Sequence, residues 1–232
     1  MSSIHTILLN LLTRFDCIDW LRFSDSSDAR RYRYKFYKKH LKYLGKNVLF
    51  DTGVFIYGMP FVSIDDNAHI DKNCIIVGSS PNLDLSYRAI KIRNNNSGII
   101  NKGEVYIGAH CHISQNTMIY GYSGVYIGNN CVMSAGSKIY SLTSMPTNPY
   151  DETEIVSIVP YEGISPTLMG KVILENNVWL GLNSVISPGI TIGKNSFVRS
   201  NSFVMKSFGE NSYIAGDPAE YIKPRFKIDK YD

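Results

Sequence analysis

The chain contains 232 residues, of which 44% are hydrophobic and 19% are charged. These fractions are ordinary for a folded globular protein and argue against long disordered stretches. The net charge of +4 is uneven: residues 1–46 hold ten Lys/Arg against four Asp/Glu, a net +6, and the rest hold fourteen against sixteen, a net −2. Because most of the chain is slightly acidic, we do not expect nucleic acid to be a partner.

Targeting signals and metal motifs are not evident in the sequence. No apolar run reaches the length of a membrane-spanning helix, and residues 4–12 lack the cleavage site of a secretory signal. The four cysteines include no CxxC pair, so we expect no metal site. Unpaired cysteines fit a reducing compartment, so we expect a cytoplasmic protein, with the inner face of the membrane as an alternative location.

The first 46 residues predict two helices. Residues 4–23 carry an amphipathic stripe, and residues 29–44 place Tyr37 and Leu41 on one apolar face. One interpretation is that residues 1–46 form a cap over the open end of the domain that follows. The alternative is that the basic, tyrosine-rich second helix contacts anionic lipid or a lipid-linked acceptor.

A six-residue repeat dominates the C-terminal third of the chain. Neither the α period of 3.6 nor simple β alternation keeps this register over thirty residues, so the repeat predicts a β-helix in which each step forms one face of a coil. We expect the aliphatic residue of each step to point inward, and a small residue four positions later to be buried near the corner. The repeated aliphatic residues are Leu174, Leu180, Ile186, Ile192, Val198 and Val204, and the same spacing appears at Ile64, Ile70 and Ile76, at Ile107, Ile113 and Ile119, and at Ile127, Met133 and Ile139.

The repeat also predicts the limits of the β-helix, residues 47–225, followed by a tail of residues 226–232. We expect irregular first coils, regular coils over residues 103–144, and an extended outward loop over residues 145–170, where four prolines interrupt the repeat. Long loops on rigid scaffolds usually carry function. Three cysteines fall at the small-residue position and are predicted to be buried: Cys74, Cys111 and Cys131.

Two segments carry a family resemblance. These are NVWLGLNSVISPGITIGKNSFVRSNSFVMKSF, from residue 177, and YIAGDPAEYIK, from residue 213. Over residues 103–225 the chain resembles the left-handed β-helix, or hexapeptide-repeat, acyltransferase family, and within it the sugar and capsular polysaccharide O-acetyltransferases. The resemblance implies an all-β left-handed parallel β-helix. It also implies a homotrimer, acetyl-CoA as co-substrate in the groove between neighbouring subunits, and no metal.

The resemblance further implies roles in acyl-CoA binding. Trp179 matches the tryptophan that lines the acyl-transfer end of the groove, and Lys206 matches the lysine that approaches the 3′-phosphate of CoA. The full set of matched positions is Trp179, Ser200, Lys206, Ala215, Gly216, Pro218 and Lys223.

The catalytic position departs from the family pattern. Where the family places a histidine that deprotonates the acceptor, this chain has Ser144, whose hydroxyl cannot act as a base near neutral pH. The best-placed substitute is His112, because it follows Ile107 by five residues as Trp179 follows Leu174. Two coils between them would give a separation of about 10 Å. The loop acids, represented by Asp151, are the other candidate bases.

Together these features predict an acetyltransferase that moves acetyl from acetyl-CoA to a sugar hydroxyl of a cell-surface polysaccharide or its precursor. Two alternatives remain open. The first is N-acylation of an amino sugar, since an amine is itself nucleophilic and needs a base less. The second is a trimeric CoA- or glycan-binding protein that has lost catalysis, because Ser144 occupies the histidine position.

Overall fold

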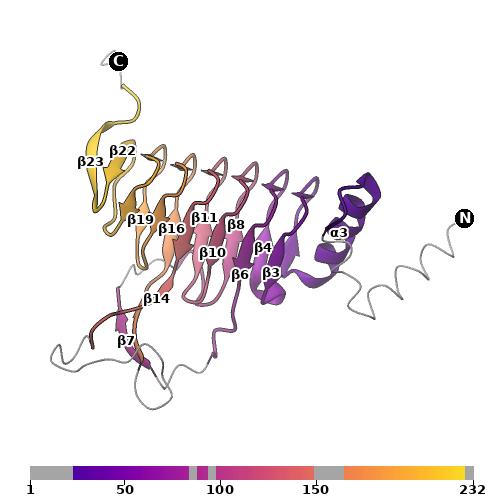
Figure 1. The fold of residues 1–232 in the computed structure, drawn as a ribbon, viewed down its shortest axis with the longest axis horizontal. Coiled ribbons are helices and arrows are strands. Elements are labelled where there is room, and N and C mark those ends of the chain that lie inside the picture. The colour runs from indigo at the N-terminus through magenta and orange to yellow at the C-terminus, as the bar shows by residue number, and fades with distance from the viewer. Residues whose placement is uncertain (1–22, 84–87, 94–97, 149–164, 228–232) are drawn as a thin grey trace, which may run out of the picture.

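A computed structural model describes residues 23–83, 88–93, 98–148 and 165–227 of the chain. The chain winds into stacked coils, each built from three short strands that contribute to three different sheets. Figure 1 shows these coils side by side along one axis, with a helix at one end of the stack and a hairpin at the other. The predicted left-handed parallel β-helix is confirmed.

Three sheets form the faces of the β-helix. The first six-stranded sheet contains β1 (Tyr43–Leu44), β4 (Val62–Ile64), β8 (Val105–Ile107), β11 (Val125–Ile127), β16 (Val172–Leu174) and β19 (Thr191–Ile192). The second contains β3 (Phe55–Tyr57), β6 (Ile75–Val77), β10 (Met118–Tyr120), β13 (Lys138–Tyr140), β18 (Val185–Ile186) and β21 (Phe203–Val204). The eight-stranded sheet contains β2 (Leu49–Phe50), β5 (His69–Ile70), β9 (His112–Ile113), β12 (Val132–Met133), β17 (Trp179–Leu180), β20 (Phe197–Val198), β22 (Ser212–Gly216) and β23 (Ala219–Pro224).

The interior follows the predicted repeat. The repeated aliphatic residues have no measurable exposure, and Cys74, Cys111 and Cys131 are buried beside them with exposed fractions of 0%, 1% and 0%. Most corners are turned by asparagine with φ near +60°, for example Asn67 at 59°, because its short polar side chain tolerates the left-handed region. His110, with φ 59°, takes the same place in one coil.

The helix α3 (Ser27–His40) covers the open end of the first coil. It starts at the N-cap Ser26, whose hydroxyl accepts from the amide of Ala29 at 3.1 Å. Tyr37 packs on Phe50 with ring centres 4.4 Å apart and donates its hydroxyl to the carbonyl of Val54. The structure thus has a helix in the second predicted segment, packed on the first coil, and the cap of residues 1–46 as a whole stays a prediction.

The boundaries of this segment differ from the prediction. The helix ends at His40 rather than near residue 44, because Tyr43 and Leu44 already form β1 and pair with Ser63 and Ile64 of β4. The first coil thus begins before residue 47. The helix predicted over residues 4–23 lies outside the described residues, apart from Phe23. Within the described part of the chain, no helix is long and apolar enough to cross a membrane.

Two segments that interrupt the repeat form a separate three-stranded sheet. The first coils are irregular as expected: β1 to β6 form two coils, but the short 3-10 turn η1 (Met59–Phe61) lies between β3 and β4. The chain leaves the coils after β6 and again after β13, and the two excursions meet. There β14 (Leu142–Ser144) pairs antiparallel with β15 (Ser165–Met169), which pairs in parallel with β7 (Arg88–Ile92). The second excursion therefore begins at Leu142, and Figure 1 shows this side sheet away from the coils.

Candidate functional site

The outer face of the eight-stranded sheet carries one continuous line of side chains. In each of its parallel strands an inward aliphatic or aromatic residue follows an outward residue, and the outward residues pair directly with one another from coil to coil. We call this line the outer ladder. From the helical end to the C-terminal end it consists of Leu49, His69, His112, Val132, Trp179, Phe197 and Tyr213.

Acidic and basic side chains alternate beside the first rungs of the outer ladder. His112 Nε2 lies 2.9 Å from Asp71 Oδ2, and the other oxygen of Asp71 lies 3.2 Å from His69 Nε2. His69 Nε2 is also 3.5 Å from Asp51 Oδ2, and Asp51 Oδ1 accepts from Arg30 Nη2 at 2.8 Å. The two imidazole rings are stacked, with centres 5.3 Å apart and planes 11° apart. His112 is thus held by a carboxylate within a connected network.

This arrangement suits proton transfer. When Nε2–H of His112 donates to Asp71, the lone pair that accepts a proton is on Nδ1. Among the described residues, Nδ1 of His112 has no hydrogen-bond partner, and the side chain is 46% exposed. A carboxylate that fixes the orientation and tautomer of an imidazole is the usual support of a histidine base. His112 therefore has the geometry of a base that is open to a ligand.

His69, Asp71 and His112 could also bind a cation. Their ligand atoms all lie within 4.8 Å of one another, and two imidazoles with one carboxylate are ligands that suit zinc. The hydrogen bond to Asp71 accounts for the placement of His112, whereas Nε2 of His69 is buried without a hydrogen-bond partner among the described residues. The expectation that the protein uses no metal stays a prediction.

Trp179 occupies the outer ladder further along. Its Nε1–H donates to Ser134 Oγ at 2.9 Å, and its ring meets Phe197 edge-on with centres 5.7 Å apart. Val132 is the one rung between His112 and Trp179, so two strand spacings separate them, which is about 10 Å. This is the separation expected if the two residues lie two coil steps apart.

The residues matched to CoA binding gather at the C-terminal end. Lys206 forms an ion pair with Glu220, and its ammonium lies 5.7 Å from the centre of the Phe208 ring. Lys223 lies 5.4 Å above the ring of Tyr213, and Ser200 Oγ accepts from the amide of Leu182. The hairpin of β22 and β23 carries the small residues Ala215, Gly216 and Pro218, and Gly216 has φ +113°, a conformation that favours glycine. Their roles toward CoA stay predictions.

The other candidate catalytic residues lie elsewhere. Ser144 is exposed in β14 of the side sheet, opposite Thr167 of β15, and is not part of the outer ladder. Asp151 and the neighbouring loop acids lie outside the described residues. Sequence reasoning missed Asp51, Asp71 and His69 as partners of His112. The available signal was spacing, because Asp51 and Asp71 each follow an outer-ladder residue by two positions.

The comparisons with known proteins agree with this architecture. A family model described as the hexapeptide repeat of succinyl-transferase matches residues 104–141 and 171–206, which are coils on either side of the second excursion. These two stretches of the chain therefore match the hexapeptide repeat. Its resemblance to the hexapeptide-repeat acyltransferases is confirmed by the relatives described next.

Two curated relatives and one solved structure illustrate the similarity. A probable macrolide acetyltransferase of Lysinibacillus sphaericus is 35% identical over 77 residues, which cover 31% of this chain and 43% of the relative. The dTDP-4-amino-4,6-dideoxy-D-glucose acyltransferase of Escherichia coli is 26% identical over 191 residues, covering 80% of this chain and 83% of the relative. A mutant of AntD, an N-acyltransferase from Bacillus cereus in complex with dTDP and coenzyme A, has a TM-score of 0.63 at 25% identity, covering 82% of this chain and 88% of that chain.

The extent of these matches differs. The chain spans less than half the length of the macrolide acetyltransferase and of several other acetyltransferases that it matches. The Escherichia coli acyltransferase and AntD match over most of both chains.

Proposed function

We propose that this hexapeptide-repeat protein transfers an acyl group from acyl-CoA to the amino group of a nucleotide-linked amino sugar. The observation that carries the proposal is the match over 80% of the chain to an acyltransferase named for a dTDP-linked amino sugar. A second support is the N-acyltransferase whose structure, with dTDP and coenzyme A, shares the fold over 82% of this chain. The N-acylation alternative thereby moves ahead of O-acetylation.

The acyl donor, acetyl-CoA, would bind along the C-terminal half of the outer ladder. Trp179 would line the transfer end, and Lys206 and Lys223 would face the phosphates of CoA. We further propose the homotrimer that the resemblance implies, because exposed apolar residues such as Trp179 and Leu182, 44% and 51% exposed, would be covered by a neighbouring subunit. Light scattering that gives a monomer at micromolar concentration would contradict the trimer.

The acceptor half places the reacting amine beside His112. The amine nitrogen attacks the thioester carbonyl, the C–N bond forms, the C–S bond breaks, and CoA leaves as the thiolate. The proton lost from nitrogen passes to Nδ1 of His112 and from there to the thiolate sulfur. Asp71 stabilises the imidazolium in between, and it does so through the 2.9 Å contact to Nε2.

O-acetylation of a sugar hydroxyl, as in a cell-surface polysaccharide, is the second candidate. It is favoured by the His112–Asp71 pair, because a hydroxyl needs the base that an amine can do without. The non-catalytic alternative would leave this pair without a role.

Release of free thiol from acetyl-CoA tests the proposal directly. The purified protein is incubated with acetyl-CoA and, separately, a dTDP-linked amino sugar, the matching free amino sugar and the 4-hydroxy analogue of the nucleotide sugar. We expect turnover with the amine. Turnover with the hydroxyl analogue alone would favour O-acetylation, and tight CoA binding without any turnover would favour the binding protein.

A further inference from the structure

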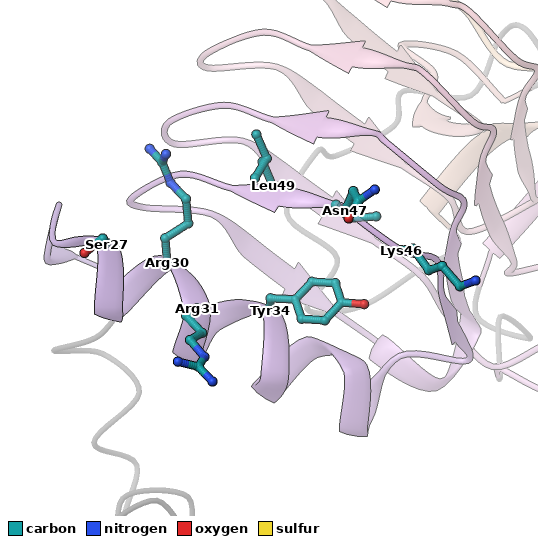
Figure 2. A pocket seen from close by; sticks show the side chains of 8 residues that line it. Ser27, Arg30, Arg31, Tyr34, Lys46, Asn47 and Leu49 are labelled. Carbon is teal, nitrogen blue, oxygen red and sulfur yellow. The ribbon is translucent and has the colours of Figure 1, made fainter. Parts of the chain in front are cut away.

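A pocket of about 550 Å³ lies between the first turns of α3 and the start of β2. Figure 2 shows side chains from the helix and from the strand on its two sides, with Leu49 next to Arg30 and Lys46 at the opposite end. The residues that matter for its chemistry are Arg30, Arg31, Tyr34, Lys46, Val48 and Leu49.

The pocket is strongly cationic. Three of its lining residues are Arg30, Arg31 and Lys46, and no lining residue is acidic. Arg30 is neutralised by Asp51 at 2.8 Å, whereas the side chains of Arg31 and Lys46 form no ion pair within the described ranges of the chain. The acid nearest Lys46 in the contacts of the structure, Asp66, accepts from its backbone amide instead. Two cations without an acidic partner therefore line the pocket from opposite ends, and Figure 2 shows their charged ends directed outward, so both side chains would have to turn to meet one ligand.

The pocket is also aligned with the acid–histidine network. Leu49 lines the pocket and is the first rung of the outer ladder, two strand spacings or about 10 Å from the rung of His112. Arg30 joins the two regions, since it lines the pocket and binds Asp51, which contacts His69. A ligand that extends along the ladder can therefore reach both His112 and the pocket.

We propose that this pocket binds the diphosphate to which the acceptor sugar is attached. A sugar placed at His112 with its anomeric end toward α3 directs that diphosphate to Arg31 and Lys46. A guanidinium can bind phosphate oxygens in a bidentate manner, and an ammonium supplies a point charge. Tyr34, Val48 and Leu49 add apolar surface for the group beyond the diphosphate. This inference rests on the proposed function, because it assumes a sugar acceptor at His112.

Two kinds of molecule could present a sugar-linked diphosphate to this pocket, a nucleotide and a polyprenyl lipid carrier. Isothermal titration of the full chain with dTDP, farnesyl diphosphate and uncharged thymidine separates them. We expect a diphosphate to bind and thymidine to bind far more weakly. Preference for dTDP assigns the nucleotide, and preference for farnesyl diphosphate assigns the lipid carrier. Failure of both diphosphates to bind would overturn the proposal.

Substitutions locate the site. Arg31→Ala and Lys46→Ala should each raise the Kd of the preferred diphosphate about tenfold or more, since a hydrogen bond to a charged group is lost. Arg31→Lys should retain part of the affinity. Lys39→Ala, an exposed cation of α3 outside the pocket, is the matched control and should leave the Kd unchanged. Equal affinity in the parent and both pocket variants would place the diphosphate elsewhere.

The same variants separate this inference from the proposed function. The Kd of CoA, measured for each variant, should not change, because Lys206 and Lys223 lie near the C-terminal end of the β-helix, away from α3. If the enzyme acylates a free amino sugar and the pocket variants leave KM for the diphosphate-linked sugar unchanged, the function stands and the pocket assignment fails. If CoA does not bind at all, the function fails, and the diphosphate titrations still decide the assignment of the pocket.

Discussion

His112 Nε2 and Asp71 Oδ2 lie 2.9 Å apart, although 41 positions separate the two residues in the chain. The contact exists because His69 and His112 are direct neighbours in the ladder, so Asp71, two residues after His69, is placed beside His112. The stacking of coils therefore gives His112 the partner that orients it.

Replacing His112 tests whether this contact serves the reaction. His112→Ala should lower kcat by about 10²-fold or more and leave the KM for acetyl-CoA nearly unchanged, because general-base catalysis acts in the transition state. Asp71→Asn should cause a smaller loss of kcat. The control is His110→Asn, since His110 sits at φ 59° in a corner where other coils have asparagine. An unchanged kcat in His112→Ala would remove this imidazole from the chemistry.

Lys206 provides a test of the donor site. Lys206→Ala should weaken CoA about ten- to a hundredfold and dephospho-CoA much less, because only CoA carries the 3′-phosphate. Glu220→Gln should strengthen CoA binding, since it removes the carboxylate that pairs with Lys206. Lys194→Ala removes a comparable exposed lysine, paired with Glu210 at 3.0 Å, and serves as control. Equal losses for CoA and dephospho-CoA would contradict the assignment.

Tyr37 should be a main stabilising contact of the helical cap. It is 2% exposed and joins α3 to Phe50 and Val54 of the first coil. Tyr37→Ala should lower the free energy of unfolding by about 3–5 kcal/mol, by analogy with other buried aromatic residues. Tyr37→Phe should cost only about 1 kcal/mol, the contribution of one hydrogen bond. Urea denaturation measures both, and equal effects would mean that the hydroxyl, not the ring, holds the cap.

Cys74 should make stability depend on alkaline pH. Burial raises the pKa of its thiol to about 12, so the folded protein keeps a proton that the unfolded chain loses above about 8.5. The stability contributed by the buried, protonated thiol is fully present below the pKa of the thiol in the unfolded chain. It is lost as the pH rises toward the higher pKa of the thiol in the folded protein. Between pH 8 and pH 10 the parent should lose about 2 kcal/mol more than Cys74→Ala. Urea titrations under reducing conditions at both pH values provide the comparison, and parallel losses would contradict it.

The repeat in the sequence predicts those features that depend on which residues face inward. A buried aliphatic residue such as Leu180 or Ile192 can occupy only one position in each six-residue step. The repeat therefore identifies the coils and the positions of the cysteines. It also predicts that His112 and Trp179 project from the same side of the β-helix, because both occupy the same place in their step.

Features that depend on contacts between distant exposed residues could not be predicted in this way. The acid–histidine network joins α3 to three successive coils, and the repeat places His112 without indicating which exposed acids contact it. The side sheet is formed by two separate excursions, and Arg93, which follows β7, donates to the carbonyl of Met205 at 2.9 Å. The prolines in residues 145–170 indicated where the second excursion lies, but not that its strand β15 pairs with β7.

The single coil of β11, β12 and β13 between the His112 rung and the Trp179 rung acts as a spacer of fixed length. Side-chain substitutions cannot alter this length, because it is set by the distance between hydrogen-bonded strands, about 4.8 Å per step. The distance between the His112 rung and the Trp179 rung can therefore change only if the protein gains or loses a whole coil. Substrates of intermediate length would have to be accommodated by the flexibility of the donor molecule itself.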